Sequence, residues 1–175
     1  IYQRSNQADS IEALLSAAST YQPDNAFLHR ELSRIYLEKD SVALALPHLW
    51  AAARLEPADY TAQRRLAIVL IASDSLDVAD SILTLLTQSG DPEPANHFYL
   101  GRVAALKGDF YRARDEFRMV TERAPTIPDG WLSLSFAYRQ LKEHEDEIET
   151  LRDALINIKD ENYAVQLYFA LGAAF

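Results

Sequence analysis

Residues 26–36 read AFLHRELSRIY and residues 128–138 read PDGWLSLSFAY, and both stretches carry the same kinds of residue at the same offsets. In each, a leucine is followed at once by a serine and then, three residues after the serine, by a tyrosine. Side chains at positions i, i+1 and i+4 lie on one face of an α-helix, so the stretches predict helices that bury this face. The matching residues are Leu32, Ser33 and Tyr36 in the first stretch and Leu134, Ser135 and Tyr138 in the second.

The two stretches lie three periods of 34 residues apart, and the same period organises the sequence between them. Frames of 34 residues that begin at Ala26, Tyr60, Pro94 and Pro128 place leucine in column 7 and a small residue in column 8 of every frame. Columns 20, 24 and 27 hold a second stripe with helical spacing, and turns such as Asp40-Ser41 at columns 15 and 16 supply its N-cap. Each frame therefore predicts a helix–turn–helix hairpin, which must stack on its neighbours to bury its apolar faces.

This arrangement resembles the tetratricopeptide repeat family, and Trp131-x-x-Leu134-Ser135-x-x-Tyr138 is among its best matches. The resemblance implies an all-α fold, a right-handed superhelical solenoid of antiparallel helix hairpins built from 34-residue repeats. Residues 1–175 are predicted to form a single array, and a chain that begins with Ile1 is expected to be a fragment of a longer protein. The predicted segments are a partial repeat at 1–25 that is mainly a second helix, full repeats at 26–59, 60–93, 94–127 and 128–161, and the first helix of a following repeat at 162–175.

Several residues depart from the family pattern or extend it. In the partial repeat, Tyr2 fits column 11 of a first helix and Leu15 fits column 24 of the second. Pro47 falls inside a second helix and is expected to bend it. Glu147 occupies column 20, where the other frames have alanine, so the second helix of the fourth repeat is expected to pack more loosely. Column 4, where the family prefers a bulky apolar residue, reads His29, Gln63, His97 and Trp131.

The composition narrows the functions open to this chain. Its 175 residues include seventeen basic and twenty-six acidic side chains, and the resulting net charge of −9 disfavours binding to nucleic acid. The absence of cysteine excludes disulfides, thiolate metal sites and cysteine nucleophiles. The longest apolar run, residues 66–72, is too short to span a membrane. The excess of arginine over lysine suggests a bacterial protein of the cytoplasm or periplasm, and the compartment stays open.

No residue pattern points to catalysis or to a cofactor. No serine stands in a nucleophile-elbow context, no glycine-rich phosphate loop is present, and no two histidines have the zinc-protease spacing. His29 and His97 share a repeat column and are interpreted as packing residues. The acidic run at 143–149 is interpreted as the solvated start of a helix, where the helix dipole favours carboxylates. We therefore expect a non-catalytic chain without a metal or a cofactor.

A second stripe on the first helices is the candidate binding surface. Columns 2, 5, 9 and 12 point roughly 130° away from the packing stripe, and the resemblance implies that they line a concave groove for a peptide or a partner helix. Arginine binds carboxylates with two parallel hydrogen bonds, so the groove predicts an acidic, partly apolar protein segment as partner. The competing interpretation is that these arginines pair with glutamates on neighbouring repeats and that the phenylalanines belong to the core between repeats. The predicted groove residues are Phe27, Arg30, Arg34, Arg64, Ile68, Phe98, Arg102, Leu132, Phe136 and Arg139.

The function predicted from this surface is that of a protein–protein interaction scaffold. Two alternatives remain open on the sequence alone. In the first, the array is a structural spacer or an oligomerisation segment, in which Leu167, Leu171 and Phe175 pair between molecules. In the second, it is the targeting arm of an enzyme whose catalytic domain lies elsewhere. The sequence does not identify the partner.

Overall fold

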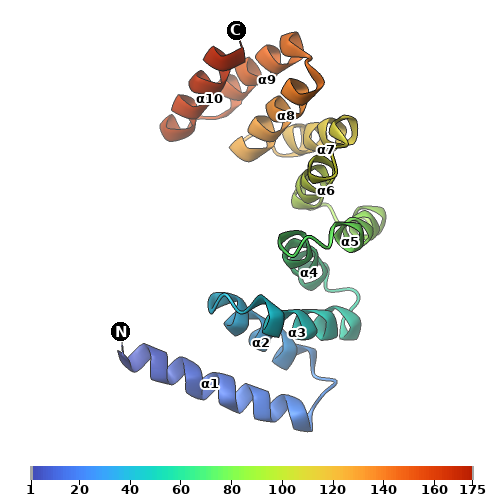
Figure 1. Ribbon diagram of the computed structural model, residues 1–175, viewed down its shortest axis with the longest axis vertical. Coiled ribbons are helices and arrows are strands. Elements are labelled where there is room, and N and C mark those ends of the chain that lie inside the picture. The colour runs from blue at the N-terminus through green and yellow to red at the C-terminus, as the bar shows by residue number, and fades with distance from the viewer. Residues whose placement is uncertain (1, 175) are drawn as a thin grey trace. The chain divides into compact units, whose positions relative to one another are not determined.

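The computed structural model describes the backbone of residues 2–174 and the side chains of residues 10–160 and 162–174. Over this part of the chain it contains ten α-helices and no β-strand, so the predicted all-α fold is confirmed (Figure 1). None of the described helices is both long and apolar enough to cross a bilayer. The helices are α1 (Tyr2–Tyr21), α2 (Ala26–Glu38), α3 (Val42–Leu55), α4 (Tyr60–Ala72), α5 (Leu76–Gln88), α6 (Ala95–Leu106), α7 (Phe110–Arg123), α8 (Pro128–Leu141), α9 (His144–Asn157) and α10 (Glu161–Ala174).

The chain divides into two compact units, and each is described by itself. Unit 1 comprises Ile1–Ile82 and unit 2 comprises Leu83–Phe175. In unit 1, α2 and α3 pack against each other, α1 contacts α2, and α3 contacts α4. In unit 2, each helix from α6 to α9 packs against the next one in the chain. Neighbours in sequence are therefore neighbours in space within each unit, as in a helical repeat.

One backbone turn recurs at column 15 of all four frames. Asp40, Asp74 and Lys142 have φ values of 53°, 59° and 62°, and Gly108 has a φ of 80°. A residue in this left-handed conformation ends the preceding helix, and only glycine adopts the conformation without a steric cost from Cβ. The turn is therefore set by its place in the repeat rather than by a fixed residue type.

Side-chain caps begin several helices. Asn25, Asp59 and Asp109 each accept a hydrogen bond from the backbone N–H three residues further on, at 3.4, 3.0 and 3.1 Å. These bonds satisfy one of the four N–H groups that a helix start leaves unpaired. Ser41, which is expected to cap α3 in the same way, does not do so, because its hydroxyl donates to the carbonyl of Lys39 at 3.2 Å.

Helix α1 is more continuous than the repeat pattern predicts. The alignment assigns Tyr2 and Leu15 to different helices, but both lie in the single helix α1. The residues between them include neither glycine nor proline, so nothing in that stretch breaks a helix. Pro47 lies inside the second helix α3, as the sequence predicts, and removes the backbone bond that residue 47 would donate to the carbonyl of Ala43.

Three of the four residues of column 4 donate hydrogen bonds to the backbone that precedes their helices, whereas His97 contacts the side chain of Glu116. The Nε2–H group of His29 donates to the carbonyl of Pro23 at 2.9 Å, and the indole N–H of Trp131 donates to the carbonyl of Pro125 at 2.8 Å. Gln63 donates to the carbonyl of Ala53 at 2.8 Å. Histidine, glutamine and tryptophan each supply the nitrogen donor for these three bonds.

The core of unit 2 contains one unusually close helix contact. Gly101 of α6 lies against the ring of the buried Phe117 of α7, and a Cβ at residue 101 would lie 2.6 and 2.7 Å from two ring carbons. In the other three frames column 24 holds leucine and column 8 holds serine or alanine. The larger Phe117 is thus accommodated by the loss of a side chain in column 8 of the same frame.

A second apolar cluster of unit 2 is formed by α8, α9 and α10. Leu167 is fully buried in it, beside Trp131 and Leu151, and Leu171 packs against the same cluster. The hypothesis that Leu167 pairs between molecules is therefore wrong, because that side chain is already covered within unit 2. Phe175 lies outside the described residues.

Candidate functional site

In unit 1, two of the predicted groove arginines are bound to carboxylates of the same unit. Arg30 pairs with Glu56 and, at 3.2 Å, with Asp59. Arg34 pairs with Glu31 and Glu38, at 2.9 and 2.7 Å, and these two carboxylates raise the pKa of its guanidinium. Carboxylates therefore neutralise both arginines, but these carboxylates lie in the same repeat, 26–59, and not in neighbouring repeats as the competing interpretation expects.

The remaining predicted residues of unit 1 differ in exposure. Phe27 is 57% exposed at the start of α2. Arg64 and Ile68 are half-buried on α4. The side chain of Phe27 therefore offers the largest accessible apolar surface among the predicted groove residues of this unit.

In unit 2, four predicted groove residues line one hollow of about 390 Å³. Phe98 and Arg102 come from α6, and Leu132 and Phe136 come from α8. The four side chains stand at equivalent columns of successive frames, which is why two different helices bring them to one place. The rest of the lining consists of Ala105, Leu106, Phe117 and Ser133.

The hollow is apolar with one cation beside it. Leu106 and Phe136 remain 59% and 43% exposed, and the ring of Phe110 meets that of Phe136 edge to face, with centroids 6.1 Å apart. The guanidinium of Arg102 lies 5.8 Å from the centre of the Tyr99 ring, a cation–π distance. Within residues 10–160 and 162–174, Arg102 makes no ion pair. Its hydrogen-bond donors are therefore available to an incoming carboxylate.

The fifth predicted residue of unit 2 is committed elsewhere. Arg139 donates from Nε to Oε1 of Glu147 at 2.7 Å, and its terminal nitrogen lies 2.5 Å from the same oxygen. Glu147 is fully buried, and its other oxygen, Oε2, has no hydrogen-bond partner among the described residues. The Nδ1 atom of His144 lies 3.6 Å from Oε2. Arg139 thus compensates the carboxylate that replaces the alanine of column 20.

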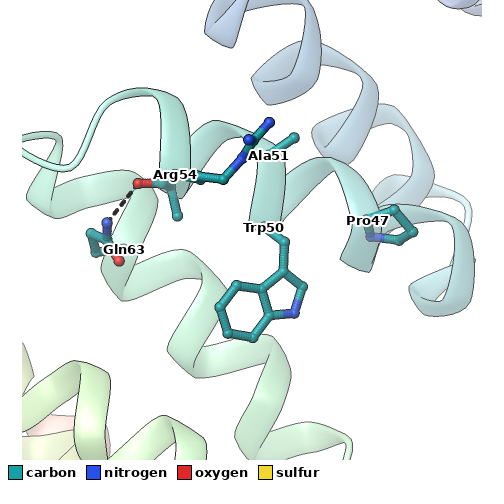
Figure 2. Close-up of a pocket in the computed structure, with 6 residues that line it drawn as sticks. Pro47, Trp50, Ala51, Arg54 and Gln63 are labelled. Atoms are coloured by element: carbon teal, nitrogen blue, oxygen red, sulfur yellow. Dashed lines mark hydrogen bonds between the residues drawn. The ribbon is translucent and has the colours of Figure 1, made fainter. Parts of the chain in front are cut away.

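A second hollow, of about 550 Å³, lies in unit 1 and includes none of the predicted residues. Figure 2 shows Pro47, Trp50, Ala51 and Arg54 on α3, with Gln63 contributed by α4. Sequence reasoning missed this hollow because it sought binding residues only on the first helix of each repeat. The sequence signal that could have indicated it is Trp50, which follows Pro47 by about one turn on the exposed face of the same second helix.

Two histidines form a hydrogen-bonded chain between α2 and α3. A backbone carbonyl only accepts, so the bond to Pro23 places the proton of neutral His29 on Nε2 and leaves its Nδ1 as an acceptor. His48 then donates from its Nδ1 to that atom at 2.8 Å, and its ring stacks on Tyr36 with centroids 5.6 Å apart. Burial lowers the pKa of His48, and the neighbouring imidazole of His29 lowers it further.

The lowered pKa of His48 predicts a pH-dependent stability. The unfolded chain, with a histidine pKa of about 6.5, binds a proton more readily than the folded chain does. The free energy of unfolding should hold above about pH 6.5 and fall as the pH drops through the pKa of folded His48. Urea denaturation between pH 5 and 7 measures this slope, and His48→Gln should flatten it. An unchanged slope in that variant would assign the pH dependence to other groups.

The other histidine and acidic residues that were considered as metal or catalytic candidates contact oppositely charged or polar side chains of the chain itself. His97 contacts Glu116 at 2.8 Å, with the same spacing of 19 residues that separates His29 from His48. In the acidic run, Glu143 lies 3.6 Å from Arg114. Over the side chains that the structure describes, no three histidine or acidic residues are grouped so that they could hold a metal ion.

The fold is similar to that of several solved structures, although no protein-family model matches the sequence. A crystal structure of MamA has a TM-score of 0.81 at 15% identity, covering 89% of this chain and 85% of that one. YrrB, described as a TPR protein with an unusual peptide-binding site, has a TM-score of 0.78 at 19% identity, with 95% and 86% covered. TTC0263, a TPR protein of Thermus thermophilus, has a TM-score of 0.69 at 19% identity, with 97% and 93% covered. The chain therefore has the fold of the tetratricopeptide repeat proteins, as its sequence predicts.

Proposed function

We propose that this chain is a protein–protein interaction scaffold that binds a peptide or a helix of a partner protein, without catalysing a reaction. The observation that carries the proposal is the hollow of unit 2, in which Phe98, Arg102, Leu132 and Phe136 converge from two successive first helices. Exposed apolar side chains gathered at one place are typical of interaction surfaces. The description of YrrB as having a peptide-binding site supports the same function for this fold.

The chemistry of the hollow specifies the partner segment. Phe98, Leu132 and Phe136 offer an apolar lining for one aromatic or aliphatic side chain. Arg102 offers paired N–H donors beside that lining, which suit a carboxylate on the same segment. The preferred ligand is therefore a short acidic and apolar segment, and the hollow of unit 2 rather than the arginines of unit 1 is the place where it binds.

The test is a selection of random peptides displayed on phage against the folded chain. We expect enrichment of sequences that place a carboxylate close to an aromatic or aliphatic residue. Arg102→Glu should weaken the binding of the selected peptides at least tenfold in isothermal titration calorimetry, because it replaces attraction of the peptide carboxylate by repulsion. Arg152→Glu, an equal change of charge at an exposed residue of α9, should leave binding unchanged.

Two results would contradict the proposal. Selected peptides that bind Arg102→Glu and Phe136→Ala as tightly as the parent chain would place the binding site elsewhere. A failure of the selection, together with dimers that persist on dilution in light scattering, would favour the structural spacer or oligomerisation segment. In both cases the far-UV circular dichroism and the melting curve of each variant must match those of the parent.

A further inference from the structure

One side of α3 carries large exposed residues that no part of unit 1 covers. Leu44 and Trp50 are 55% and 45% exposed, and Pro47 and Arg54 are also exposed. At 100° per residue these four positions fall within about a third of the helix circumference. Pro47, Trp50 and Arg54 line the hollow of about 550 Å³ shown in Figure 2, and Leu44 lies on the same side of the helix. This surface is distinct from the hollow of unit 2, to which the proposed function refers.

Two polar side chains of this hollow, those of Trp50 and Arg54, are hydrogen-bond donors without an acceptor among the described residues. Neither the indole N–H of Trp50 nor the guanidinium of Arg54 has a hydrogen-bond partner within the described part of the chain. Gln63 already donates to the carbonyl of Ala53 at 2.8 Å (Figure 2). By contrast, the indole N–H of Trp131 in unit 2 is paired with the carbonyl of Pro125. An occupant of the hollow must therefore bring acceptors of its own.

The charge of the lining also selects its occupant. Arg54 is the charged residue of the lining, which includes no carboxylate. Glu56, the acidic residue nearest to it in sequence, is already paired with Arg30. In a chain with a net charge of −9, this places an unneutralised cation next to apolar side chains. One carboxylate on the occupant would complete the electrostatic balance, with a paired geometry that arginine favours.

We propose that this hollow binds an extended, proline-containing segment of another polypeptide that carries a carboxylate. An extended polyproline-type segment has no internal hydrogen bonds, so its carbonyls are free to accept from the indole of Trp50. Its proline rings pack on the exposed indole and on Pro47, which is how aromatic surfaces recognise such segments. Its carboxylate binds Arg54.

The experiment follows the two indole N–H signals by heteronuclear NMR during a titration with a blocked peptide of repeated Pro-Pro-Glu. The signal of Trp50 should move and saturate, while that of the buried and paired Trp131 should stay in place and serve as an internal control. A blocked peptide of repeated Pro-Pro-Lys should cause at least tenfold weaker shifts, and a peptide of repeated Gly-Gly-Glu should do the same.

Four variants separate this hollow from the rest of the surface. In calorimetry, Arg54→Glu and Trp50→Ala should each weaken binding of the Pro-Pro-Glu peptide at least tenfold. Arg65→Glu, an equal change of charge on α4 outside the lining, should bind normally, and so should Arg102→Glu. The proposal is overturned if the Trp50 signal does not respond, or if Arg54→Glu binds as the parent does. It is also overturned if the signal shifts with protein concentration alone, because a second copy of the chain would then occupy the hollow.

Discussion

Gly101→Ala is expected to lower the free energy of unfolding of unit 2 by about 2 kcal/mol. The new Cβ would lie 2.6 Å from a carbon of the Phe117 ring, which is itself buried and has little room to move. Overpacking of this kind costs about 1–3 kcal/mol, and a contact as close as 2.6 Å places this site at the upper end of that range. The gain in helix propensity of about 1 kcal/mol offsets part of it and leaves about 2 kcal/mol. Urea denaturation followed by far-UV circular dichroism measures the change.

A matched glycine and a second substitution show whether the cause is the contact with Phe117. Gly172 is also helical, but a Cβ there would meet nothing within 4 Å, so Gly172→Ala should be neutral or slightly stabilising. Phe117→Leu restores the residue that the other frames carry in column 24 and removes the obstructing ring. Added to Gly101→Ala, it should recover at least 1 kcal/mol relative to the sum of the single effects. Simple additivity of the two changes would show that the strain has another source.

Arg139→Ala is expected to destabilise unit 2 by about 2–3 kcal/mol. It leaves Glu147 fully buried with both carboxylate oxygens unpaired, since Oε2 already has no hydrogen-bond partner among the described residues. Breaking a buried ion pair from one side costs about 3–5 kcal/mol. We expect less here, because Arg139 is 42% exposed and the pair is therefore partly screened.

The reverse substitution should behave in the opposite way. Glu147→Ala installs the residue that is fully buried at the same column of the other three frames, at Ala45, Ala79 and Ala113. Arg139 then turns to water, so this variant should be neutral or stabilised by about 1 kcal/mol. Adding Arg139→Ala to it should cost almost nothing. A full cost of Arg139→Ala in that background would mean that the arginine stabilises unit 2 through packing rather than through Glu147.

Much of the fold could be predicted from the sequence because its signals are local or periodic. The caps at Asp59 and Asp109 act over three residues, and the buried leucines recur with the repeat. The N-terminal helix α1 shows the limit of this reasoning. Without a helix-breaking residue, the stretch from Tyr2 to Leu15 forms one helix, and an alignment alone does not reveal that.

The candidate site was predictable only in part, because side-chain pairing depends on which residues the fold brings together. Columns alone place Phe98 and Phe136 on one surface, and the structure brings them to one hollow. The columns do not reveal that Arg139 meets a carboxylate on the following helix. Nor do they reveal that Trp50 stays exposed, since its exposure depends on how α3 and α4 pack.

The hydrogen bonds of column 4 bear on how such an array can be rearranged. His29 and Trp131 each donate to a main-chain carbonyl of the segment before their own helix. Because every residue type supplies that acceptor, a transplanted or duplicated repeat does not require a complementary side chain from its new predecessor. The close fit of Gly101 and Phe117 lies within one frame and would be inherited together with it. We therefore expect the insertion, deletion or shuffling of whole repeats to disturb the fold less than the exchange of single residues between frames.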